Sequence, residues 1–191
     1  MIKSFDLGFS SIPAQKKATK GILHMLKIVK YPASILTKKA KEVEEITPDL
    51  LSFVSQMEIA MEKNQGVGLA APQIGVSKQI ILVRGERKNQ VFFNPKIRSK
   101  DKKGKVDEEG CLSLPGLFLP IKRAERVQVF CLTKDGKPVL LLAEGLAARI
   151  FQHEIDHLLG KLIIERITPL QRWKIREELN EIRKKGRVQK K

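Results

Sequence analysis

The sequence lacks the features of a disulfide-rich or membrane-spanning protein. It has two cysteines, Cys111 and Cys131, among 191 residues, too few for a disulfide framework, and this favours a reducing compartment. No run of about eighteen apolar residues occurs, so no segment is predicted to span a membrane. With 42% hydrophobic residues, the chain is long enough to bury the core of one domain.

Acidic residues are also scarce. Asp and Glu number 21 against 37 Lys and Arg, which gives a formal net charge of +16. This charge predicts attraction to polyanions such as nucleic acid, the ribosome or anionic lipid. Charge alone does not distinguish among them.

Only three histidines are present, and two of them share the stretch FQHEIDHLLG at residues 151–160. The stretch predicts a helix that ends at Gly160. His153 and His157 then lie on one helical face with Glu154 beside them, the arrangement of zinc-type hydrolases. A solvated surface helix is the simpler alternative, but Phe151 and its apolar neighbours favour a buried helix.

The residue types fit hydrolysis. Two neutral imidazoles can hold a divalent cation, which lowers the pKa of a water from about 16 toward about 7, and an adjacent carboxylate can take that water's proton. Glu154 is therefore a candidate general base and not a ligand.

A third protein ligand remains to be found. The metzincin pattern would place a histidine where Ile163 stands, and the other histidine, His24, is far upstream. A thermolysin-like site would use a downstream glutamate, such as Glu177 or Glu178. A cysteine is the other option.

Two further stretches have the character of ligand-contacting loops. The first, GVGLAAPQIG at residues 66–75, lacks the preceding strand of a dinucleotide fingerprint and favours close approach of a ligand backbone, with Gln73 directed at it. The second, EEGCLSLPG at residues 108–116, contains Cys111, which could be an inert core residue or a thiolate ligand. Cys131 lies within an apolar strand pattern and is predicted to be structural.

The remaining patterns predict an α+β fold. Thr47-Pro48-Asp49 is a helix start, and an apolar stripe continues to about Asn64, with Met57 and Met61 as core fillers. Residues 78–83, 91–97, 127–132 and 138–142 are predicted strands, with a hairpin at Asp135-Gly136. Residues 98–105 are predicted to be a solvated charged turn. We expect antiparallel sheets packed around the central HExxH helix, followed by a C-terminal helix.

GVGLAAPQIG, EGCLSLPG and QHEIDHLLG, in this order, resemble the three signature motifs of peptide deformylases, which remove the N-formyl group from nascent bacterial proteins. The resemblance covers roughly residues 26–169. It implies that Cys111, His153 and His157 are the metal ligands. It also implies that Glu154 is the catalytic acid and base, and that Gln73 and the Leu112 backbone N–H stabilise the oxyanion.

The resemblance further implies one divalent metal ion, Fe2+ in the cell, with Zn2+, Ni2+ or Co2+ as substitutes. The substrate would be an N-formylmethionyl nascent peptide that lies extended along the Gly66–Leu69 backbone. The residues expected at the substrate-binding site are Val67, Gly68, Gly110, Leu146 and Ile150. Some family members carry an arginine where this chain has Phe118. The resemblance therefore does not show how this chain anchors the substrate main chain.

Three regions are expected along the chain. Residues 1–26 form an N-terminal extension that is predicted to be flexible or to reflect an early start codon. Residues 27–170 form the catalytic domain, and residues 171–191 form a basic C-terminal helix and tail. The resemblance implies ribosome docking through this helix, no membrane or specific DNA partner, and a bacterial cytoplasmic location, with an organelle of bacterial descent as the alternative.

Two other functions remain open. A metallopeptidase would use Glu177 or Glu178 as the third ligand instead of Cys111. A basic RNA- or ribosome-binding protein with a decayed site is disfavoured, because no catalytic position is missing.

Overall fold

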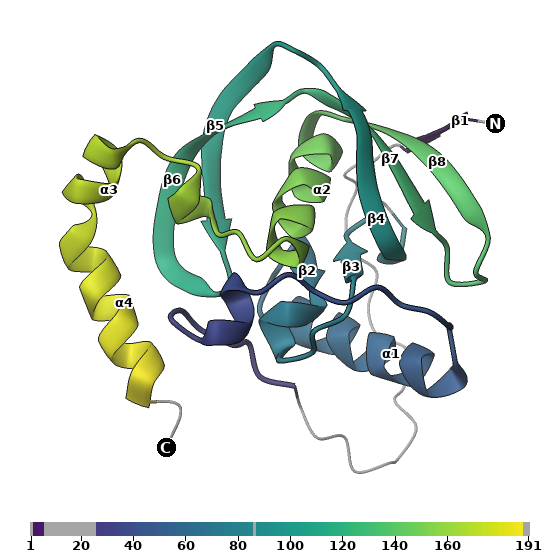
Figure 1. The fold of residues 1–191 in the computed structure, drawn as a ribbon, viewed down its shortest axis with the longest axis horizontal. Helices are drawn as coiled ribbons and strands as arrows, with labels where there is room; N and C mark the ends of the chain where they lie inside the picture. Colours follow the sequence, from purple (N-terminus) through teal and green to yellow (C-terminus); the bar gives the residue numbers. More distant parts are fainter. Residues whose placement is uncertain (1, 6–25, 86, 189–191) are drawn as a thin grey trace.

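The computed structural model describes residues 2–5, 26–85 and 87–188 (Figure 1). The strands are β1 (Ile2–Phe5), β2 (Gly68–Ala70), β3 (Ile80–Val83), β4 (Gln90–Lys100), β5 (Gly104–Cys111), β6 (Leu114–Ala124), β7 (Arg126–Leu132) and β8 (Pro138–Glu144). The α-helices are α1 (Pro48–Lys63), α2 (Gly145–Leu158), α3 (Pro169–Lys174) and α4 (Arg176–Val188). Three short 3-10 helices are η1 (Ser34–Thr37), η2 (Ala71–Ile74) and η3 (Ile163–Glu165).

Helix α2 lies between two sheets. Six strands form one sheet in the order β1-β8-β7-β4-β3-β2, in which only the β1–β8 pair is parallel, and β5 and β6 form the second sheet. Figure 1 shows α2 enclosed by the long β5–β6 hairpin and the larger sheet, and α2 contacts strands of both. The predicted α+β arrangement around a central HExxH helix is therefore confirmed.

Helix α1 begins and ends as the sequence predicts. The Thr47 hydroxyl accepts a hydrogen bond from the Leu50 N–H at 3.2 Å, and Asn64 is the C-terminal cap. Met57 and Met61 are fully buried in a cluster with β2 and β3. They are core fillers, as expected, and α1 thereby supports the strand that precedes Gln73.

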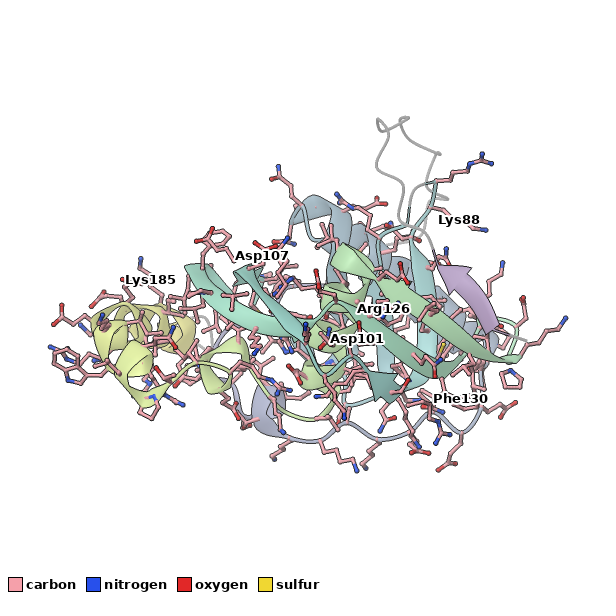
Figure 2. All side chains as sticks on the ribbon, turned by 90° about the horizontal axis from the view of Figure 1, so that it is seen from above. Lys88, Asp101, Asp107, Arg126, Phe130 and Lys185 are labelled. Carbon is pink, nitrogen blue, oxygen red and sulfur yellow. The ribbon has the colours of Figure 1, made fainter. Side chains whose placement is uncertain are left out.

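The prediction of a solvated turn over residues 98–105 is wrong. Strand β4 continues to Lys100 and pairs with β7, β5 starts at Gly104, and only residues 101–103 lie between them. The backbone pairs here while the charged side chains reach solvent, so charge did not prevent strand formation. Figure 2 shows Asp101 beside Arg126 at this end of the sheet, where they form an ion pair of 2.9 Å.

The C-terminal region forms two helices instead of one. Thr168 caps α3, but the chain leaves helical geometry at Ile175 before α4 begins. Leu179 and Ile182 of α4 are buried against the hairpin core. No helix within the described residues is long and apolar enough to cross a membrane.

The N-terminal extension is described in part. Ile2–Phe5 form β1, which pairs with β8 at the edge of the large sheet. The rest of the predicted flexible segment, apart from Leu26, lies outside the described residues.

Candidate metal centre and hydrolytic site

Helix α2 carries the HExxH residues into the interior. It begins at Gly145, which has a φ of +54°, and Gly160 follows its end with a φ of +71°. Glu154 and His157 are buried, with exposures of 4% and 1%, and the His153 side chain is 11% exposed. The predicted helix and its glycine terminus are confirmed, and the polar face of this helix points inward.

Cys111 meets the two histidines from the opposite side. It ends β5, next to an irregularity in the β5–β6 pairing, and its Sγ lies 3.3 Å from His157 Nε2. One ligand-type atom from each of Cys111, His153 and His157 lies within 4.8 Å of the others. This is the one such group of three or more found in the described part of the chain. Sulfur and two imidazole nitrogens are a donor set that suits a divalent transition metal.

The electrostatics of the cluster favour a thiolate. Burial opposes ionisation of the Cys111 thiol, but His157 and His153 outweigh it and hold its pKa well below the ordinary value. Burial likewise disfavours the charged form of His153, yet Cys111 and Glu109 raise its pKa well above the usual range. A cation bound at these three atoms would balance the charge of the thiolate.

Glu109 fixes the orientation of His153. Its Oε2 lies 3.0 Å from His153 Nδ1, so a proton on Nδ1 leaves Nε2 free to face the cluster. Burial would raise the pKa of Glu109, but hydrogen bonds from His153 and Arg123 lower it to about 2. The carboxylate is thus ionised, as an orienting partner of a metal-bound imidazole should be. His157 Nδ1 has no hydrogen-bond partner among the described residues.

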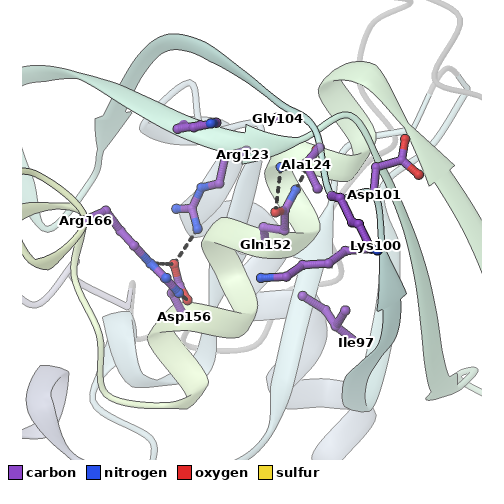
Figure 3. A pocket seen from close by; sticks show the side chains of 11 residues that line it. Ile97, Lys100, Asp101, Gly104, Arg123, Ala124, Gln152, Asp156 and Arg166 are labelled. Carbon is purple, nitrogen blue, oxygen red and sulfur yellow. Dashed lines mark hydrogen bonds and ion pairs between the residues drawn. The ribbon is translucent and has the colours of Figure 1, made fainter.

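A buried ion-pair network continues beneath α2. Arg123 donates to Glu109 at 3.0 Å through both Nε and Nη2, and it contacts Asp156 at 2.5 Å. Arg166 also pairs with Asp156, and Arg149 donates to Glu109 at 2.6 Å. Figure 3 shows Asp156 held between Arg123 and Arg166 on one side of the helix.

Sequence reasoning missed this network. Glu109 lies two residues before Cys111, on the same face of β5, and Asp156 lies three residues after His153 on α2. These spacings could have indicated supporting carboxylates. Arg149 lies on α2 itself, but Arg123 and Arg166 could not be found by spacing, because they come from a different strand and a later loop.

Glu154 has the properties of a proton acceptor. Burial raises its pKa to about 7, against the opposing effect of the two imidazoles. Its Oε2 has no hydrogen-bond partner in the described structure. A side chain at Gly68 would collide with Glu154 Oε1 and Ile150 Cγ2, so the absence of a side chain at Gly68 leaves room for this carboxylate.

Gln73 and Leu112 border the same centre. Gln73 is 1% exposed, and its Oε1 accepts a hydrogen bond from the Ala70 N–H at 2.8 Å. This contact directs the amide nitrogen toward Cys111, with Nε2 at 3.7 Å from Sγ. Leu112 follows Cys111 directly, which places its backbone amide next to the thiolate.

The residues predicted to bind substrate surround this centre unequally. Ile150 is buried next to Gly68, whereas Leu146, one helical turn earlier, is 42% exposed and Val67 is 38% exposed. Gly110 is exposed beneath the ring of Phe118, which would contact a side chain at that position. Phe118 itself is 60% exposed. An apolar ring therefore lies over Gly110 at the border of the site.

The alternative third ligands lie elsewhere. Glu177 and Glu178 are exposed on α4, and Glu177 pairs with Arg176. Neither belongs to the Cys111, His153 and His157 group. The thermolysin-like ligand set is therefore not the one that this fold assembles.

Comparisons with known proteins agree with this arrangement. The sequence profile of the polypeptide deformylase family matches residues 25–173. A peptide deformylase of Thermodesulfovibrio yellowstonii is 45% identical over 160 residues, covering 81% of this chain and 96% of that protein. One from Desulforudis audaxviator is 43% identical over 151 residues, covering 78% and 98%.

Solved structures give the same result. A peptide deformylase from Legionella pneumophila superposes with a TM-score of 0.78 at 40% identity, covering 87% of this chain and 98% of that one. Arabidopsis thaliana peptide deformylase 1B, in complex with an inhibitor, superposes with a TM-score of 0.81 at 37% identity, covering 85% and 93%.

Proposed function

This chain belongs to the polypeptide deformylase family, and we propose that it removes the N-formyl group from the N-terminal formylmethionine of nascent polypeptides, releasing formate. The observation that carries the proposal is the buried group of Cys111, His153 and His157, with Glu154 beside it. A purely structural cluster would not require a carboxylate whose pKa is raised to about 7 and whose Oε2 has no hydrogen-bond partner among the described residues.

Cys111 Sγ and the Nε2 atoms of His153 and His157 would hold one divalent metal ion. The bound ion would act as a Lewis acid that makes a water more acidic and polarises the formyl oxygen. Three protein donors are the number typical of catalytic metal sites, whereas structural sites usually supply four. A thiolate ligand suits a redox-capable ion, so we propose Fe2+ in the cell, with Zn2+, Ni2+ or Co2+ as substitutes.

Glu154 would move the proton. Its carboxylate accepts a proton from the attacking water as the water oxygen bonds to the formyl carbon. It then donates that proton to the departing amine as the carbon–nitrogen bond breaks. The products are formate and a free methionyl N-terminus, and Glu154 returns to its starting state. A pKa of about 7 suits both transfers near neutral pH.

Gln73 and Leu112 would meet the developing negative charge. The Gln73 amide nitrogen is held toward the centre by the Ala70 contact, and the Leu112 N–H follows the metal-binding residue in the chain. Donors that are fixed before the reaction stabilise an oxyanion without reorganising during it. Both groups are therefore proposed as catalytic residues.

The substrate would approach along β2. This strand is at the edge of the large sheet, so an extended peptide can pair with it beside Glu154. Ile150 would contribute to the apolar pocket for the methionine side chain, with Val67 and Leu146 at its rim. Phe118 over Gly110 would offer an apolar contact to the peptide that follows.

We also propose that the protein binds the ribosome through α4 and the basic tail and acts there on the nascent chain. The proposed location is a bacterial cytoplasm or an organelle of bacterial descent. Lys184 and Lys185 lie on exposed parts of α4. Reversing both charges should weaken ribosome pelleting in a salt-dependent manner, whereas reversing Lys38 and Lys39 should not. Equal pelleting of the two variants would refute this docking surface.

The catalytic proposal is tested by formate release from an N-formylmethionyl tripeptide. Glu154→Gln should lower kcat by roughly two to four orders of magnitude, the usual contribution of a general acid and base. Glu177→Gln, a matched change at an exposed position, should leave it unchanged. Activity retained in Glu154→Gln, or cleavage of internal peptide bonds with no formate released, would overturn the proposal.

A further inference from the structure

The segment Val29–Tyr31 connects two loops of the site that are far apart in sequence. The Val29 N–H donates to the carbonyl of Gln73 at 2.7 Å, and the Tyr31 N–H donates to the carbonyl of Ser113 at 3.0 Å. One short stretch of backbone is thus hydrogen-bonded both to the loop that carries Gln73 and to the loop that carries Leu112.

The Lys30 side chain adds a third hydrogen bond, between this segment and the loop that carries Leu112. Its Nζ donates to the carbonyl oxygen of Leu112 at 2.7 Å in a partly buried setting. Burial lowers the pKa of Lys30, and the neighbouring Cys111 thiolate opposes that change. Lysine usually keeps its ammonium in water. Here the ammonium is instead directed at one peptide group next to the catalytic centre.

The contact restrains Leu112. A charge-assisted hydrogen bond on the Leu112 carbonyl resists rotation of the peptide plane that follows this residue. The preceding plane, which contains the Leu112 N–H, begins at Cys111, whose Sγ lies 3.3 Å from His157 Nε2 and whose backbone pairs with Leu114. With both ends restrained, the N–H retains a fixed direction, and an oxyanion donor must be fixed in this way to act.

Helix α4 supports the same segment from behind. Arg183 Nη2 donates to the Tyr31 hydroxyl at 2.8 Å. Gly186 packs so closely that an added Cβ would collide with the Tyr31 carbonyl. In Figure 1 the dark-blue segment before η1 lies next to the C-terminal half of α4. The segment therefore lies between α4 and the site.

We propose that Lys30 is a positioning residue for the deformylase reaction, acting through the Leu112 peptide to keep its N–H aimed at the formyl oxygen. The inference rests on the proposed function. Lys30 would lower the free energy of the transition state, in which negative charge develops on that oxygen. It would have little effect on the affinity for the peptide in the ground state.

The test compares Lys30→Met, Lys30→Gln and Lys30→Arg with the control Lys27→Met, an exposed lysine two residues before the segment. Formate release gives kcat and KM for each protein. Inhibition by the product, a methionyl tripeptide without the formyl group, gives the affinity of the site for the peptide alone. Metal content and melting temperature are also measured for each protein. Lys30→Met should lower kcat roughly ten- to hundredfold, less than outright loss of an oxyanion donor. KM, product binding and metal content should stay within about twofold of wild type.

Lys30→Arg, which retains a charged donor, should restore most of kcat, and Lys30→Gln should be intermediate. The inference is overturned if Lys30→Met and Lys30→Gln keep wild-type kcat. It is also overturned if kcat falls only together with metal content or melting temperature, or if arginine fails to rescue it, because Lys30 would then support the fold or the metal ligands. If the wild-type chain releases no formate, the proposed function itself fails, which is a separate result.

Discussion

Replacement of Arg123 by methionine is expected to destabilise the protein strongly. The Arg123 side chain is 4% exposed and bridges Glu109 and Asp156, which are also buried. Methionine fills a similar space but removes the cation, so two buried carboxylates lose their shared partner. Breaking a buried ion pair in this way typically costs about 3–5 kcal/mol.

The remaining contacts place the expected loss near the lower end of that range. Glu109 keeps Arg149, and Asp156 keeps Arg166. For a chain of this size, about 2–4 °C of melting temperature corresponds to 1 kcal/mol. A loss of about 3 kcal/mol therefore predicts a decrease in melting temperature of about 6–12 °C.

The assay is thermal unfolding followed by circular dichroism, with metal-loaded and metal-free protein measured separately. Arg126→Met is the matched control, since Arg126 is 59% exposed and pairs with Asp101 at the surface. It should change the melting temperature little. If Arg123→Met unfolds within about 2 °C of wild type in both metal states, the network does not stabilise the fold as argued.

Three further predictions concern the site. Gly68→Ala should lower kcat/KM by at least about tenfold, because its methyl group would displace the Glu154 carboxylate; an unchanged value in formate-release kinetics would contradict that packing. Because the pKa of Glu109 is depressed to about 2, its contribution to stability is fully present above about pH 4.5 and is lost as the pH falls toward 2. Glu109→Gln should therefore flatten this part of the acid-unfolding curve, and parallel curves would refute the assignment. In metal-free protein a thiol reagent should modify Cys111 before Cys131, whose pKa is raised to about 12 by burial, and added Zn2+ should slow the reaction at Cys111, as read by peptide mass spectrometry.

Much of the site could be predicted because its signals are local. The spacing of His153 and His157 fixes a common helical face once the segment is helical, and Gly160 marks the end of that helix. Cys111 was one of two open choices on spacing alone. The fold decided between them, because β5 ends next to α2 and the exposed α4 glutamates do not reach it.

The supporting residues could not be predicted because their partners come from distant segments. Lys30 resembles any other surface lysine in the sequence, and its role depends on the loop that follows Cys111. Arg123 lies in a strand with an alternating pattern, and its burial depends on carboxylates from β5 and α2. The strand over residues 98–100 was missed for the opposite reason: its charged side chains are exposed, and pairing with β7 overrides their low propensity for strands.

We propose that one metal ion, held by Cys111, His153 and His157, supports formyl hydrolysis at this site, and this role can be measured. It is tested most directly by titrating oxygen-free, metal-free protein with Ni2+ or Fe2+ while metal binding and formate release are measured together. We expect turnover to rise in proportion to bound metal and to saturate at one ion per chain, and we expect Cys111→Ala neither to retain the ion nor to release formate. Turnover in the metal-free wild type, or one ion bound equally well by Cys111→Ala, would contradict it.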